Sequence, residues 1–76
     1  MKMLEDFKIK HLGAFVANEV GKSVYIVSIT IDPDIYIDDN ENDFQQCTIE
    51  YGVCGQGENE TADFLWYCED EELLKV

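Results

Sequence analysis

Hydrophobic and polar residues alternate with a period of two along much of the chain, and this period is typical of β-strands. The clearest case is residues 46–53, in which Cys47, Ile49, Tyr51 and Val53 alternate with polar residues and a glycine. Successive side chains of a strand point to opposite faces of a sheet. The pattern therefore predicts a strand that is buried on one face.

Three other segments show related patterns. Residues 7–18 begin with alternating apolar residues and lysines, residues 25–31 are rich in β-branched side chains, and residues 62–68 carry large apolar side chains on both faces. A turn is expected at residues 19–22 and a loop at residues 55–61, where glycines permit a positive φ. Two hairpins of this kind predict an antiparallel sheet of about four strands.

The expected fold class is mainly β to α+β, in a single domain that spans residues 1–76. One sheet must cover its apolar face, either with a short terminal helix or by curling into a small barrel. Residues 69–76 are expected to form one or two helical turns, because acids precede a lysine as the helix dipole favours. The alternative is a helical start to the chain, since Leu4, Phe7 and His11 share one helical face.

The large aromatic residues and the cysteines indicate the core. Phe64 and Trp66 fall on one face of a predicted strand and Tyr67 on the other. All three are expected in the core, because a sheet this small needs its large aromatic side chains inside. Cys47 falls on an apolar face and is expected to be a buried thiol. Three cysteines without a zinc or redox spacing indicate reduced thiols in a cytoplasm, and a Cys54–Cys68 disulfide remains an alternative.

The distribution of charge is the most unusual feature of the sequence. The chain holds 17 acids against 5 lysines and has a formal net charge of −12. Residues 23–74 contain fourteen acids and no base, so that residues 23–76, with one lysine, carry −13. Crowding of like charges costs folding free energy. This charge argues against direct binding to nucleic acid and against docking on anionic lipid.

The first acidic cluster lies between the two predicted hairpins. Its acids and one tyrosine form the first part of the expected partner-binding surface: Asp32, Asp34, Tyr36, Asp38, Asp39, Glu41 and Asp43. Alternate residues of an extended chain lie about 6.6 Å apart on one face, which is of the order of the phosphate spacing in a nucleic-acid strand. We expect Ile31, Ile35 and Ile37 to anchor this segment while its acids point outward.

A second acidic cluster follows the last predicted strand and completes the expected surface: Glu69, Asp70, Glu71 and Glu72. Glu58, Glu60 and Asp63 precede it in the sequence. Acidic runs often serve only as a solvated surface that keeps a protein soluble. Two clusters without any arginine favour a binding surface, and Tyr36 is the expected exposed anchor within it.

The sequence offers little for catalysis or metal binding. His11 is the single histidine, and no glycine-rich phosphate loop is found. An EF-hand that began at Asp32 would place Tyr36 and Ile37 where an oxygen ligand and a glycine are needed. We expect no catalytic residue, no cofactor and no metal ion. No apolar run reaches the length of a membrane span, and charged residues near the N-terminus interrupt the apolar core of a secretory leader.

In size, net charge and its acid-only stretch, residues 23–74, the chain resembles the small acidic inhibitors that bacteriophages direct against host defence. These are the anti-restriction, anti-CRISPR and DNA-mimic glycosylase-inhibitor proteins. The resemblance implies a non-catalytic inhibitor in the host cytoplasm. Its partner would be a basic, nucleic-acid-handling host protein such as a nuclease, a restriction or CRISPR effector, or a defence ATPase.

The alternative is a binding module of another class, such as an immunity protein, an antitoxin or an adaptor. Such a module would recognise its partner through an apolar sheet edge, and its acids would serve solubility. Dimerisation with a second copy is a further way for so small a domain to complete its core.

Overall fold

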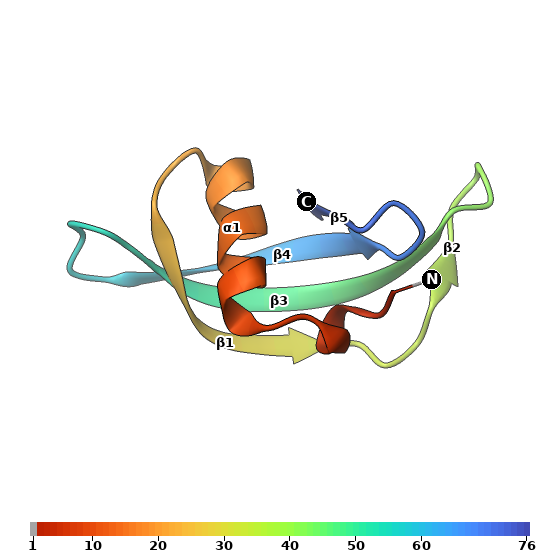
Figure 1. Ribbon diagram of the computed structural model, residues 1–76, viewed down its shortest axis with the longest axis horizontal. Coiled ribbons are helices and arrows are strands. Elements are labelled where there is room, and N and C mark those ends of the chain that lie inside the picture. Colours follow the sequence, from red (N-terminus) through yellow and green to blue (C-terminus); the bar gives the residue numbers. More distant parts are fainter. Residues whose placement is uncertain (1) are drawn as a thin grey trace.

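A single antiparallel sheet carries one helix across one of its faces (Figure 1). The computed structural model describes residues 2–76. The elements are a 3₁₀ turn η1 (Leu4–Asp6), the helix α1 (Ile9–Val20), and the strands β1 (Val24–Ile31), β2 (Tyr36–Ile37), β3 (Asp43–Val53), β4 (Asn59–Tyr67) and β5 (Glu72–Lys75). The strand order is β1-β3-β4-β5, and the short β2 pairs with the start of β3 beyond the end of β1. The fold class expected from the sequence, mainly β with a short helix, is confirmed.

The core lies between α1 and the sheet. Alternate residues of the central strands β3 and β4 face the helix, and Ile49, Phe64 and Trp66 are fully buried there. Leu12 and Val16 of α1 meet them from the other side. The predicted strands at residues 25–31, 46–53 and 62–68 are confirmed, and so is the core position of Phe64 and Trp66. Tyr67, also expected in the core, instead lies half-buried on the open face, because it points to the side of β4 opposite Trp66. The opposite face of the sheet has no covering element among residues 2–76.

The strand predicted for residues 7–18 is wrong, because this segment forms α1. Leu12, Phe15 and Val16 share one side of the helix and pack on the sheet. The predicted hairpin turn at residues 19–22 is the end of this helix. Gly21 adopts the left-handed conformation (φ 70°), and its N–H donates to the carbonyl of Ala17 at 2.9 Å, which is a common way to end a helix.

The helical turns predicted for residues 69–76 are also wrong. Residues 68–71 form a turn, with Glu71 at φ 51°, and the chain then pairs with β4 as the strand β5. Leu73 lies opposite Trp66 and is buried, whereas Leu74 lies on the open face. An isolated helix this short is marginal in water, so the free edge of β4 provides the better partner for the backbone.

The three cysteines are all free thiols, and the Cys54–Cys68 disulfide is wrong. Cys54 is exposed beyond the end of β3, whereas Cys68 is buried at the opposite end of the β3–β4 ladder. Cys47 is buried as expected. Burial, with the nearby carboxylate of Asp63, raises the pKa of the Cys47 thiol to about 11. The pKa of Cys68 is also raised by burial.

The N-terminal segment closes the core at one end of the sheet. The N–H of Lys2 donates to the carbonyl of Cys68 at 3.2 Å, and the indole N–H of Trp66 donates to the carbonyl of Lys2 at 2.9 Å. Gln45 is fully buried, and its Oε1 accepts the N–H of Leu4 at 3.0 Å. These bonds fix the start of the chain against β3 and β4.

Candidate functional site

A row of side chains crosses the open face of the sheet from β2 to β5. The strand registers place Tyr36 opposite Phe44, Phe44 opposite Tyr67, and Tyr67 opposite Glu72. The ring centroids of Tyr36 and Phe44 are 5.8 Å apart in a stacked arrangement, and those of Phe44 and Tyr67 are 5.7 Å apart. We call these three residues the aromatic row. Phe44 and Tyr67 are half-buried, whereas Tyr36 is 38% exposed.

Two acidic turns lie directly beyond the aromatic row, at the same end of the molecule (Figure 1). One is the turn between β2 and β3 and the other is the turn between β4 and β5. The N–H of Cys68 donates to the carbonyl of Asp43 at 3.1 Å, which places the end of the first turn beside the start of the second. We call this region the acidic end, and its residues are Asp38, Asp39, Glu41, Asp43, Glu69, Asp70, Glu71 and Glu72. The fold thus unites most of the two clusters that the sequence separates.

Asp38 shapes the first acidic turn. Its Oδ1 accepts the backbone N–H groups of Asn40 and Asn42, both at 2.9 Å. The turn then passes through Glu41 at φ 63°, a conformation that non-glycine residues rarely adopt. The hydrogen bonds, that from Asn42 most of all, lower the pKa of Asp38. Asp38 therefore holds the turn, whereas Asp39 and Glu41 are left exposed to solvent.

Asp32 has a similar structural role before β2. Its Oδ1 accepts the N–H of Asp34 at 3.0 Å, and its Oδ2 accepts the hydroxyl proton of Tyr36 at 2.9 Å. This hydrogen bond, together with the negative charge of Asp32, raises the pKa of Tyr36. Asp32 and Asp34 lie in the connection between β1 and β2, outside the acidic end.

The expected linear display of carboxylates, anchored by isoleucines, is wrong. Ile31 packs against the core as expected, but Ile35 is 41% exposed and Ile37 is 68% exposed, so neither of these two residues anchors the segment. The short strand β2 pairs with β3 through Tyr36 and Ile37, and the chain bends at residues 33–34 before it and turns at residues 38–42 after it. A chain that turns twice within twelve residues cannot keep its carboxylates at the spacing of an extended strand.

The acids near the β3–β4 hairpin do not join the acidic end. Glu58 and Glu60 lie toward the opposite end of the sheet, where the β3–β4 hairpin turns. Asp63 lies in the middle of the open face, and its Oδ1 accepts the hydroxyl proton of Thr48 at 2.8 Å. Glu50, also on the open face, accepts from Ser28 at 3.3 Å.

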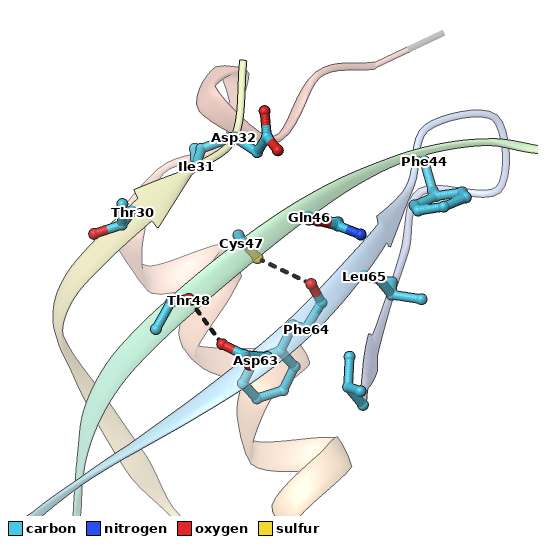
Figure 2. Close-up of a pocket in the computed structure, with 11 residues that line it drawn as sticks. Thr30, Ile31, Asp32, Phe44, Gln46, Cys47, Thr48, Asp63, Phe64 and Leu65 are labelled. Atoms are coloured by element: carbon cyan, nitrogen blue, oxygen red, sulfur yellow. Dashed lines mark hydrogen bonds between the residues drawn. The ribbon is translucent and has the colours of Figure 1, made fainter. Parts of the chain in front are cut away.

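A hollow of about 620 Å³ opens on the uncovered face between β1, β3 and β4 (Figure 2). Phe44 and Leu65 join it to the aromatic row, and Asp32 and Asp63 are its carboxylates. Burial keeps the pKa of the Cys47 thiol, which also lines the hollow, at about 11. The charged side chains that line the hollow are thus two carboxylates, and this lining suits a basic or an apolar side chain.

The sequence contains a signal for the aromatic row and the hollow. Phe44, Leu65 and Tyr67 alternate with buried residues, and therefore fall on the face that a half-buried strand exposes to solvent. Large apolar residues at such positions indicate a contact surface. The contact of Phe44 with Tyr36 depends on the strand β2, which was not expected from the sequence.

The described residues offer little else for catalysis or metal binding. His11 is exposed on α1, with its ring 6.4 Å from that of Phe7. Among residues 2–76, no group of three or more His, Cys, Asp or Glu side chains is arranged to hold a metal ion. Within the same residues, no helix has the length and apolar character that crossing a membrane requires.

The protein is thus a small antiparallel sheet with one helix on one face, and an aromatic row on the other face, beside an acidic end. No known protein family, curated protein or solved structure matches the chain.

Proposed function

We propose that this protein is a non-catalytic inhibitor whose acidic end binds a basic, nucleic-acid-handling host protein. One observation carries the proposal. The partly exposed rings of Tyr36, Phe44 and Tyr67 lie directly beside two turns that hold six of the eight residues of the acidic end.

Apolar anchors surrounded by charge are the usual anatomy of a protein interface. Aromatic residues dominate the energetic centre of such interfaces, and polar residues form the rim. Tyrosine faces attract arginine guanidinium groups, and carboxylates bind them through paired hydrogen bonds. Four neighbouring strands span roughly 14 Å. The acidic end therefore suits an arginine-rich patch of comparable width.

The net charge supports the same partner. A charge of −12 on 76 residues accelerates encounter with a positive surface and repels the phosphate backbone of nucleic acid. A protein that itself binds nucleic acid presents such a positive surface. The proposed site of action is the host cytoplasm, and binding would exclude the nucleic acid from the partner.

The proposed contact between the acidic end and its partner differs from simple mimicry of a phosphate backbone. The carboxylates of Asp32 and Asp38 already accept hydrogen bonds from groups within the chain. The exposed acids of the two turns and the aromatic row remain for the partner. Recognition should therefore depend on Tyr36 and Tyr67 as well as on charge.

A pulldown from a lysate of the host, washed at low and then at high salt, tests the proposal. A basic nucleic-acid enzyme that is retained at low salt and released at high salt is the expected result, because salt screens exposed charges. A retained partner that is not basic, or one that survives high salt, would contradict it.

A pair of charge reversals provides a matched test once the partner is in hand. Glu69→Lys with Asp70→Lys changes the acidic end, and Glu58→Lys with Glu60→Lys makes the same change in net charge near the β3–β4 hairpin. All four residues are exposed. Only the first pair should abolish binding. Equal losses would show that net charge alone matters, and the acidic end would not be the binding site.

A second candidate function, a module that binds through an apolar sheet edge, is favoured by one observation. The edge strand β1 contains no charged residue. A complex formed through this edge would survive high salt, which separates the two functions in the same pulldown.

A further inference from the structure

Within residues 2–76, no strand pairs with the outer side of the edge strand β1. The strand order of the sheet ends at β1, and its eight residues, VYIVSITI, include no charge, no proline and no glycine. Natural edge strands are commonly protected by charged residues, proline or short length, because unpaired backbone groups recruit other strands. β1 lacks all three of these protections, and its one irregularity is a bulge at Val27.

The hydrogen bonds to β3 define which groups of β1 face outward. Asp32 N–H donates to the Gln46 carbonyl at 2.9 Å, and Cys54 N–H donates to the Ser23 carbonyl at 3.0 Å. In an antiparallel ladder every second residue bonds to the neighbouring strand, and the bulge at Val27 shifts this phase. Four residues therefore direct their N–H and C=O groups away from β3. They are Val24, Ile26, Ile29 and Ile31.

An apolar groove of about 480 Å³ runs between the start of β1 and the helix α1. Small residues of α1, Gly13, Ala14 and Ala17, line one side, and Val24 and Ile26 line the other. Ile9, at the mouth of the groove, is 65% exposed. A strand that paired with β1 would place alternate side chains beside this groove.

Opposite charges flank β1. Lys22 precedes the strand, whereas Asp32 and Asp34 follow it, and Lys22 and Asp34 are exposed. When two copies of a strand pair antiparallel around a twofold axis, the start of each lies beside the end of the other. Lys22 of each copy would then lie near Asp32 and Asp34 of the other copy, once on each side of the axis.

We propose that β1 pairs antiparallel with β1 of a second copy of the chain, which joins the two sheets into one. The register that brings the outward groups together sets Val24 opposite Ile31 of the second copy, and Ile26 opposite Ile29. In this register Lys22 lies between Asp32 and Asp34 of the second copy. The four outward residues carry their side chains on the helix side of the sheet, so Ile29 and Ile31 of the second copy lie beside the groove.

This arrangement also separates the two highly charged regions. The acidic end lies beyond the carboxyl end of β1 in each copy (Figure 1), and antiparallel pairing directs these ends to opposite sides of the dimer. Repulsion between the two copies is smaller at that separation, because salt screens charges beyond a Debye length. The dimer would present two acidic ends, each free for a partner.

Sedimentation of the purified chain across a wide concentration range tests the dimer, at ~0.15 M salt where the Debye length is about 8 Å. The expected result is a species of twice 8.7 kDa that dissociates on dilution. A monomer at every concentration would overturn the proposal and would make the bulge at Val27 a sufficient protection of the edge.

Substitution of Val27, which is 47% exposed at the centre of β1, locates the interface. Val27→Lys places two lysines near the twofold axis and should abolish the dimer over the same concentrations. Val27→Thr keeps a β-branched, uncharged side chain and should leave the dimer intact. Circular dichroism of both variants verifies the fold. A dimer unaffected by Val27→Lys would place the interface elsewhere and would overturn the proposal.

A charge exchange tests the register. Lys22→Asp alone, and Asp34→Lys alone, should each weaken the dimer, whereas the double variant should restore it. Asp34 suits this exchange because its side chain makes no hydrogen bond within residues 2–76, so the turn can keep its shape. Failure of the double variant to recover would contradict the proposed register.

Discussion

The hydroxyl of Tyr36 donates a hydrogen bond of 2.9 Å to the carboxylate of Asp32, four residues earlier in the chain. The same tyrosine ring stacks on Phe44. One short contact thus connects a loop carboxylate to the first ring of the aromatic row, and it holds the exposed end of that row in place.

This contact predicts an altered titration of Tyr36. The hydrogen bond and the charge of Asp32 raise the pKa of Tyr36 above its ordinary value of 10.0, because both favour the protonated phenol. The contribution to stability is therefore complete below the pKa of the unfolded chain and is lost as the pH rises through the folded pKa. Asp32→Asn should lower the pKa of Tyr36. Ultraviolet titration, with Tyr36→Phe to assign the signal, measures the change.

The turn of Asp38 predicts the opposite dependence on pH. Hydrogen bonds from the backbone of Asn42 and Asn40 lower the pKa of Asp38, so its contribution is present above the unfolded pKa and is lost as the pH falls through the folded pKa. Asp38→Ala should speed amide exchange at Asn40 and Asn42. The neighbour Asp39 is exposed and makes no hydrogen bond within residues 2–76, so Asp39→Ala is the control. Similar exchange in the two variants would contradict the role of Asp38.

Two adjacent glutamines should differ sharply in their effect on stability. Gln45 is fully buried and accepts the N–H of Leu4, whereas Gln46 is exposed on the other face. Gln45→Leu leaves that N–H without a partner and should reduce the free energy of unfolding by about 1–3 kcal/mol. Gln46→Leu should change it by less than about 0.5 kcal/mol. Urea denaturation of both variants measures the difference, and equal values would contradict the buried contact.

The three thiols should react in two classes. Cys54 is exposed, whereas Cys47 and Cys68 are buried, and burial raises the pKa of both, that of Cys47 to about 11. The thiolate is the reactive form. An aromatic disulfide reagent should therefore modify one thiol quickly in the native protein and all three after denaturation. Cys54→Ser should remove the fast reaction, and a second fast thiol in that variant would contradict the buried positions.

The sequence by itself determined the central part of the sheet. In β3, Cys47, Ile49 and Tyr51 alternate with polar residues, and this pattern has only one solution that buries the apolar side chains, since a shift by one residue would expose them all. The same reasoning placed Phe64 and Trp66 in the core.

Tertiary structure decided the two ends of the chain. Residues 7–18 hold apolar side chains at spacings that suit both a strand and a helix, and the uncovered core face of the sheet selects the helix. Residues 72–75 hold too few side chains to favour either state, and the free edge of β4 selects the strand.

The candidate site shows the same division. The sequence gives the number of acids and their two clusters, because charge is a property of composition. Only the registers of β2, β3 and β4 bring Asp43 beside Cys68 and place Phe44 between Tyr36 and Tyr67. The contacts of Asp43 with Cys68 and of Phe44 with Tyr67 join residues more than twenty positions apart. Such contacts depend on the pairing of whole strands, and no local pattern of side chains records that pairing.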